Sequence, residues 1–176
     1  GCTTDTEKGM VLLQESVEFG LQEKQNSLLL LFKDEPELCY IIGSLYSEKW
    51  KKDDLAITWF LQSAKQGNVD AQYKLGISYY NFEQYLAAEN WLLAAAASNN
   101  PDAQYKLGNM YYDGCVSTKN GGTVIPRNLL KAGIMYEKLA NNPSRDTEKY
   151  SFMYRLFECG MFCKNSNNSK AVDFLR

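Results

Sequence analysis

A seven-residue segment occurs twice, unchanged, in this chain. Residues 70–76 read Asp-Ala-Gln-Tyr-Lys-Leu-Gly, and residues 102–108 read the same, 32 positions later. Chance does not produce such identity in a sequence of mixed composition. Self-similarity at a period of about 20 to 50 residues is typical of folds in which one supersecondary unit stacks on the next. The chain is therefore expected to fold as a stacked array of repeats.

Each copy of the repeat predicts two helices with an apolar stripe. Ala71, Leu75 and Tyr79 are four residues apart, so they share one face of the first helix. The second helix carries a stripe of mixed small and large residues. The residues expected in the core are Ala71, Leu75, Tyr79, Ala103, Leu107 and Tyr111 of the first helices, and Ala56, Trp59, Phe60, Ser63, Ala64, Ala88, Trp91, Ala96, Ala132, Met135 and Ala140 of the second.

Glycines occur within these helices, and glycine and asparagine occur at the predicted helix ends. Gly76 and Gly108 fall in the middle of a first helix, where glycine costs about 1 kcal/mol relative to alanine. A cost repeated in two copies indicates a repeated benefit, and we expect it to be a close helix crossing. Gly67 and the segment 99–101, Asn-Asn-Pro, predict helix ends.

The repeat sets the expected domain organisation. Residues 1–8 are predicted to be a flexible tether and 9–176 one repeat domain, with units at about 10–33, 37–67, 70–100, 102–142 and, in part, 149–176. The fourth unit is longer because it contains an insertion at 113–128. Asn120, Gly121 and Gly122 in this insertion suit the tight turn of a hairpin. The insertion either contacts a partner or is an idle surface loop.

The pattern Ala-x-x-x-Leu-Gly-x-x-Tyr, followed by Ala-x-x-Trp-x-x-x-x-Ala, resembles the Sel1-like repeat, a relative of the tetratricopeptide repeat. The resemblance covers about residues 37–142. It implies an all-α, right-handed superhelix (solenoid) of about four antiparallel helix pairs, whose first helices line a concave side that binds another protein. Sel1-like proteins include signalling adaptors, envelope proteins and periplasmic immunity proteins that block toxic effectors, such as lipases delivered by type VI secretion.

Charge and composition narrow the function. The 19 Lys and Arg against 21 Asp and Glu give a net charge of −2, which argues against a nucleic-acid partner. The chain contains no histidine, so the commonest general base and zinc ligand are missing. We therefore expect a non-enzymatic binding protein with no cofactor and no metal. The alternatives are a cell-wall-active enzyme or peptidoglycan-binding protein, and an adaptor that self-associates through its C-terminal end.

The cysteines indicate in which cellular compartment the protein is located. Gly1 and Cys2 resemble the end of a bacterial lipoprotein signal, with Cys2 as the lipidated residue, although Gly1 is equally explained as the remnant of a cleaved tag. The first interpretation predicts a bacterial periplasmic protein whose one membrane contact is a lipid anchor. The other cysteines are expected to be buried thiols, with two disulfides as the alternative; they are Cys39, Cys115, Cys159 and Cys163.

A row of tyrosines with neighbouring cations is the predicted binding surface. Tyrosine combines large area with few rotors, and it is frequent at binding hot spots. The competing interpretation is that duplication copied residues that pack between neighbouring units. A monomer or a weak homo-oligomer is expected to present this surface. The candidate residues are Tyr73, Lys74, Ile77, Tyr80, Tyr105, Lys106, Asn109, Tyr112, Tyr40, Tyr154 and Arg155, with Asn120, Gly121 and Gly122 of the inserted loop.

Overall fold

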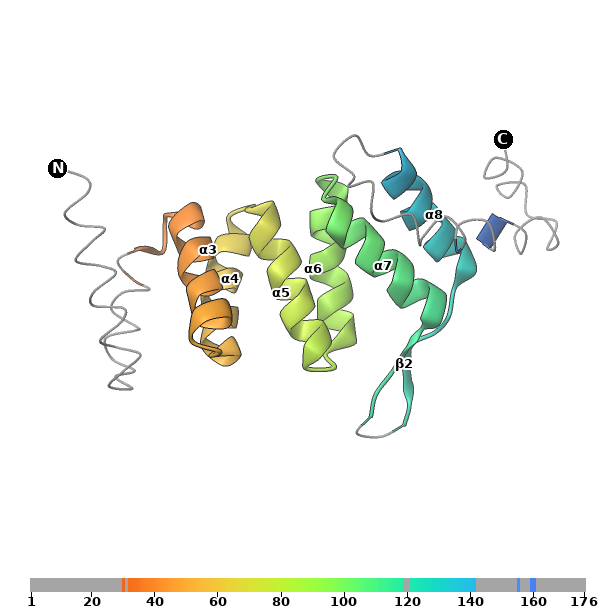
Figure 1. Cartoon of the computed structure of the whole chain (residues 1–176), viewed down its shortest axis with the longest axis horizontal. Helices are drawn as coiled ribbons and strands as arrows, with labels where there is room; N and C mark the ends of the chain where they lie inside the picture. Colours follow the sequence, from red (N-terminus) through yellow and green to blue (C-terminus); the bar gives the residue numbers. More distant parts are fainter. Residues whose placement is uncertain (1–29, 31, 119–120, 142–154, 156–158, 161–176) are drawn as a thin grey trace. The chain divides into compact units, whose positions relative to one another are not determined.

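The computed structural model describes residues 30, 32–118, 121–141, 155, 159 and 160, and these form mainly helices joined by short turns, with one short hairpin (Figure 1). The chain divides between Ala71 and Gln72 into two compact units, which are described in turn. Within the described ranges, no helix is long and apolar enough to cross a membrane. The predicted units at 10–33 and 149–176 fall almost entirely outside these ranges and stay predictions.

The first unit is built on one helix pair. Helix α3, Pro36–Ser44, continues into a π-helical segment, η1, Leu45–Lys49, and α4, Asp53–Lys65, packs against both. Proline suits the first turn of α3 because that turn has no need of its N–H. Two aspartates in the first turn of α4 complement the positive end of its helix dipole.

A buried serine ties the two helices of this pair together. Ser63 of α4 is fully buried, and its hydroxyl donates a hydrogen bond of 2.6 Å to the carbonyl oxygen of Pro36. A buried hydroxyl is tolerated when it is hydrogen-bonded. The prediction that a serine belongs to this core stripe is therefore confirmed, and its partner is a helix-end carbonyl.

The second unit contains the two copies of the repeated segment. Its helices are α5, Val69–Asn81, which begins at the boundary between the units, α6, Tyr85–Ala97, α7, Pro101–Asp113, and α8, Leu129–Ala140. Helix α7 packs against both α6 and α8. The hairpin of β1, Cys115–Val116, and β2, Thr123–Ile125, projects from the end of α7 (Figure 1).

The asparagine caps repeat with the helices. The side-chain oxygen of Asn68 accepts the Ala71 N–H at 2.8 Å, and that of Asn100 accepts the Ala103 N–H at 2.9 Å. Asn128 caps α8 in the same way. Such caps satisfy N–H groups that have no partner inside the helix. The predicted helix ends are confirmed, since α4 ends at Lys65 and α6 at Ala97.

The mid-helix glycines lie at close crossings, as expected. A Cβ on Gly76 would lie 2.7 Å from Cγ of Leu92, and a Cβ on Gly108 would overlap the ring of Tyr136. The first unit has the same arrangement, because a Cβ on Gly43 would lie 2.7 Å from the Phe60 ring. In each pair the missing side chain admits a large residue of the following helix.

Most of the predicted core is buried. Three predicted core residues are only half-buried: Tyr79, Trp91 and Ala140. A ring as large as that of Trp91 reaches from the core to the surface, so it seldom loses all contact with water. The buried members of the prediction are Ala71, Leu75, Ala103, Leu107, Tyr111, Ala56, Trp59, Phe60, Ser63, Ala64, Ala88, Ala96, Ala132 and Met135.

The insertion forms a hairpin, and the described cysteines are thiols. Cys115 pairs with Ile125 across the antiparallel strands, and Gly121 takes a positive φ of 66° in the connection. Cys39, Cys115 and Cys159 are buried thiols, which confirms the thiol interpretation for these three. Cys2 and Cys163 lie outside the described residues.

Candidate protein-binding surface

Helices α5 and α7 bring a lysine onto a tyrosine ring. The ammonium of Lys106 lies 3.3 Å from the centroid of the Tyr80 ring, and Tyr85 packs edge-on against the same ring at 5.2 Å. Lys106 is half-buried, and this desolvation lowers its pKa. The prediction that the first helices lie side by side is confirmed at this contact. A cation held against a ring face is attracted by the quadrupole of the ring.

One repeat further on, two arginines flank the equivalent tyrosine. The guanidinium carbon of Arg155 lies 4.7 Å from the centroid of the Tyr112 ring, and that of Arg127 lies 5.3 Å from it. Arg127 follows strand β2, so the inserted hairpin contributes a cation to the tyrosine row. Sequence reasoning treated the row and the loop as two separate candidate surfaces and missed Arg127.

The backbone path explains why Arg127 reaches Tyr112. Gly114 ends α7 with a positive φ of 76°, and a Cβ there would lie 3.2 Å from the backbone N of Arg127 and from the carbonyl O of Ile125. The N–H of Asn128 donates to the carbonyl of Tyr111 at 2.7 Å. The returning strand is thereby held against the end of α7.

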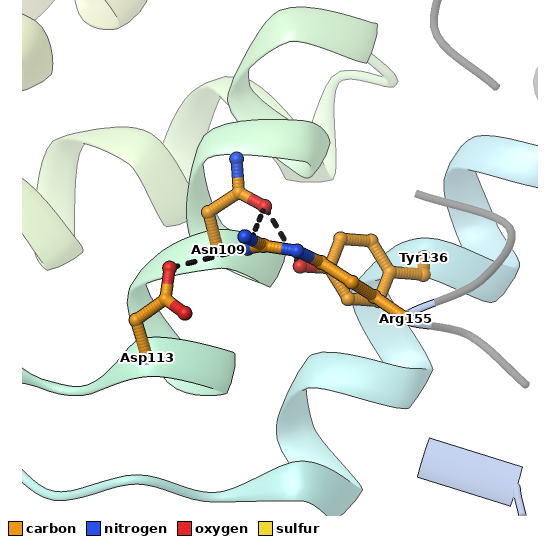
Figure 2. Close-up of polar contacts among 4 residues, drawn as sticks. All are labelled: Asn109, Asp113, Tyr136 and Arg155. Atoms are coloured by element: carbon orange, nitrogen blue, oxygen red, sulfur yellow. Dashed lines mark hydrogen bonds and ion pairs between the residues drawn. The ribbon is translucent and has the colours of Figure 1, made fainter. Parts of the chain in front are cut away.

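A polar network fixes Arg155 over the end of α7 (Figure 2). Its guanidinium donates to the side-chain oxygen of Asn109 at 2.9 Å and pairs with Asp113 at 3.1 Å. The hydroxyl of Tyr136 donates to the same Asn109 oxygen at 2.8 Å. Burial raises the pKa of Tyr136, which keeps its hydroxyl protonated as a donor. Asn109, predicted as a contact residue, therefore acts as the acceptor that joins α7, α8 and Arg155.

A glutamate in the α5–α6 turn anchors the hairpin. The Glu83 carboxylate accepts the backbone N–H of Thr118 at 2.9 Å, the Thr118 hydroxyl, and the Ser117 hydroxyl at 3.3 Å. Glu83 itself takes a positive φ of 59°. The described start of the insertion is thus held against the α5–α6 turn, while the partner contact expected of the loop stays a prediction. Nothing in the sequence around Glu83 pointed to a partner 35 residues away.

A second cluster of charges lies between α6 and α8 and is internally matched. Tyr111 donates to Glu89 at 2.5 Å, and the ammonium of Lys131 lies 3.9 Å from the same carboxylate. Burial, and then the bond to Glu89, raises the pKa of Tyr111. The adjoining cavity of about 140 Å³ is lined mainly by Leu86, Glu89, Tyr111 and the β2 strand. Its small volume suits one side chain rather than a cell-wall fragment.

The other predicted contact residues are distributed as follows. Tyr73, Lys74, Ile77 and Tyr105 are half-buried on α5 and α7, and burial followed by Asp102 raises the pKa of Tyr73. Tyr40 lies in the first unit, with its ring centroid 6.1 Å from that of Phe60, which favours the packing interpretation for this residue. Gly121 and Gly122 are exposed. Cys2, Asn120 and Tyr154 lie outside the described residues, so lipidation and the contacts expected there stay predictions.

Among the described residues, no three Cys, Asp or Glu side chains lie close enough together to bind a metal ion.

Two solved structures resemble the chain. A Sel1 repeat protein from Oxalobacter formigenes aligns with a TM-score of 0.59 and 23% identity over 95% of this chain. A protective antigen present in uropathogenic Escherichia coli strains, displaying an SLR fold, aligns with a TM-score of 0.53 and 24% identity over 75% of this chain.

The chain has a Sel1-like repeat fold. This confirms the predicted all-α solenoid class, which the repeated motif indicated. The chain spans 66% of the length of the first structure and 30% of the second. No family model and no curated protein matches the sequence. The Sel1-like fold therefore rests on the repeat, the helix pairs and the two structural matches together.

Proposed function

We propose that this Sel1-like chain is a non-enzymatic scaffold that binds another protein. Its binding surface is the tyrosine–cation surface, defined as Tyr80, Lys106, Tyr112, Arg127 and Arg155. The observation that carries the proposal is the recurrence of one arrangement. Tyr80 and Tyr112 occupy equivalent positions 32 residues apart, and each has a cation on its ring.

The arrangement suits recognition because it is already ordered. Tyr80 is held by Tyr85 and Lys106, and Arg155 is fixed by Asn109 and Asp113. A partner that meets ordered side chains loses less conformational freedom on binding, which favours affinity. Tyrosine and arginine are also among the residue types most enriched at binding hot spots. Repeat folds use such faces as extended binding surfaces.

Affinity capture from a bacterial envelope fraction tests the proposal. The bait is the full chain, compared with a Tyr80→Ala, Tyr112→Ala variant and with Phe82→Ala, which removes an aromatic side chain 40% exposed in the α5–α6 turn. We expect one near-stoichiometric partner for the wild type and for Phe82→Ala, and its loss in the double variant. Circular dichroism establishes that each variant folds.

Two outcomes would contradict this assignment. A partner retained by the double variant would move the binding surface away from the tyrosines. Turnover of peptidoglycan by the purified chain would replace the scaffold with the alternative function, a cell-wall-active enzyme.

Two more specific hypotheses rest on the resemblance to Sel1-like proteins and not on any contact observed in this chain. One is an immunity or inhibitor role, and the other is a periplasmic location. An immunity protein would abolish the activity of the captured partner at equimolar ratio, so an assay of that partner with and without the chain tests the first. Fractionation of cells that produce the full-length protein tests the second.

A further inference from the structure

Around the tyrosine–cation surface, the carboxylates have partners within the fold, whereas two of the cations have no carboxylate partner in the described residues. Three carboxylates in the same part of the second unit have partners within the fold. Asp113 pairs with Arg155 at 3.1 Å, Glu83 accepts bonds from the hairpin, and Glu89 accepts the Tyr111 hydroxyl. These anions are therefore occupied within the fold.

Two cations of the same surface have no such partner. Lys106 and Arg127 each contact a tyrosine ring, and neither pairs with a carboxylate anywhere in the part of the chain that the structure describes. A ring face attracts a cation but does not accept its N–H groups as a carboxylate oxygen does. Both side chains thus keep hydrogen-bond donors for an anion from outside.

From this imbalance we propose that the partner docks through an acidic segment, whose carboxylates bind Lys106 and Arg127. The inference rests on the proposed function and names the chemistry of the partner. Arginine pairs with a carboxylate through two parallel N–H bonds, and lysine acts as a point charge. Lys106 is half-buried, so a carboxylate that reaches it restores part of the solvation that burial removed.

The repeat also sets the spacing of the partner's charges. Each cation lies on an equivalent tyrosine of consecutive first helices, and neighbouring helix axes are about 8–10 Å apart. A segment in the polyproline II conformation has three residues per turn and advances about 3.1 Å per residue, so side chains three residues apart lie on the same side. Two carboxylates roughly three residues apart in such a segment therefore match the two cations.

A nucleic acid fits the same surface less well. Phosphate backbones are normally bound by several cations gathered on one face, and binding weakens steeply when salt is added. Here two cations of this surface lack a carboxylate partner among the described residues, Asp113 pairs with Arg155 of the same surface, and the whole chain carries a net charge of −2. The acidic protein segment is the better match.

Fluorescence anisotropy with the full chain tests the proposal. The probe is a fluorescein-labelled peptide of Gly and Ser with a Glu at every third position, and the control probe has Gln in place of each Glu. We expect the Glu peptide to bind and Lys106→Gln or Arg127→Gln to weaken its binding about three- to tenfold each. Raising the salt from about 50 to about 300 mM should weaken binding further.

Lys138→Gln is the matched control variant. Lys138 is an exposed cation of α8, so its substitution removes the same charge without touching a tyrosine ring. We expect this variant to bind the Glu peptide as the wild type does. Thermal unfolding followed by circular dichroism is measured for all variants, and each is expected to melt as the wild type does.

Several results would overturn the inference. They are equal binding of the Gln peptide, no binding of the Glu peptide up to about 1 mM, unchanged binding by both cation variants, and tighter binding of an oligothymidylate with the same dependence on Lys106 and Arg127. Affinity capture separates this failure from that of the scaffold. A partner kept by Lys106→Gln, Arg127→Gln but lost by the double tyrosine variant would leave the scaffold standing and remove the acidic segment.

Discussion

At the scale of single residues, glycine decides how closely these helices approach. Gly43, Gly76 and Gly108 each face a large side chain of the next helix that a Cβ would displace. The conformational cost of glycine in a helix is offset by the tight contact it permits. The repeated glycine of the motif is thus a packing residue, and its effect is measurable as stability.

Gly108→Ala is expected to destabilise the chain by about 1–3 kcal/mol, the usual range for overpacking a core. The new Cβ overlaps the Tyr136 ring, and this outweighs the gain of about 1 kcal/mol in helix propensity. Urea unfolding followed by circular dichroism measures the change. Asn90→Ala, at an exposed position of α6, is the control and should not destabilise. Equal stability of Gly108→Ala and wild type would contradict the crossing.

A buried thiol predicts a pH dependence. Burial, then Glu35 and Asp34, raises the pKa of Cys39 from 9.0 to about 11. The unfolded chain therefore loses this proton at lower pH than the folded chain, so the contribution of Cys39 to stability falls as the pH rises from about 9 to about 11. The free energy of unfolding should fall less steeply over this window in Cys39→Ala than in wild type. Identical slopes would contradict the prediction, because other alkaline titrations are common to both proteins.

At the scale of elements, the hairpin is fixed at both of its described ends. Glu83 holds its start, while Gly114 and Asn128 hold its return against α7. A two-stranded hairpin this short is not stable alone, so these contacts decide where it lies. They also place Arg127 on the tyrosine row, which links the insertion to the proposed function.

Glu83→Ala is expected to release the hairpin without unfolding the helices. It removes the acceptor of three hydrogen bonds from Ser117 and Thr118. Hydrogen exchange should become faster in peptides that contain Thr118 and stay unchanged in α8. Glu137→Ala, which removes a carboxylate from α8, is the control for the loss of charge. Faster exchange throughout the second unit would show that the glutamate stabilises more than the hairpin.

At the scale of the whole molecule, each of the two units has its own set of buried side chains. Phe60 and Ile42 belong to the first, and Leu107 and Tyr136 to the second. In repeat folds each unit contacts mainly its neighbours, so stability is close to a sum of local terms. A substitution in the core of one unit is therefore expected to lower the stability of the helices of that unit more than that of the other unit.

Phe60→Leu tests this local stability. The ring is almost fully buried against Gly43, and shortening it is expected to cost about 1–3 kcal/mol. Native-state hydrogen exchange should accelerate in α3 and α4 more than in α7 and α8. The complementary variant Leu107→Ala should show the reverse order. A uniform acceleration by either variant would mean that the described helices unfold as one cooperative block.

The sequence by itself determined the helices and most of the core of this protein, because the patterns that predict them are local and occur in each repeat. The 32-residue period, the four-residue spacing of Ala71 and Leu75 and the helix-end signals at Gly67 and at 99–101 predict helices, their ends and most of the core. The same logic placed Tyr80 and Lys106 in one row of tyrosines and cations on consecutive first helices. Periodicity suffices for these features, since each follows from helical geometry within a unit or between identical units.

Only the tertiary structure decided how the insertion joins the surface. Arg127 reaches Tyr112 because the hairpin returns past Gly114, and Glu83 finds Thr118 across 35 residues. No repeat or period encodes these contacts, because they depend on the path of a segment that one unit alone contains. The sequence determined the helices that present the tyrosines, and the three-dimensional path of the chain determined which cations lie on them.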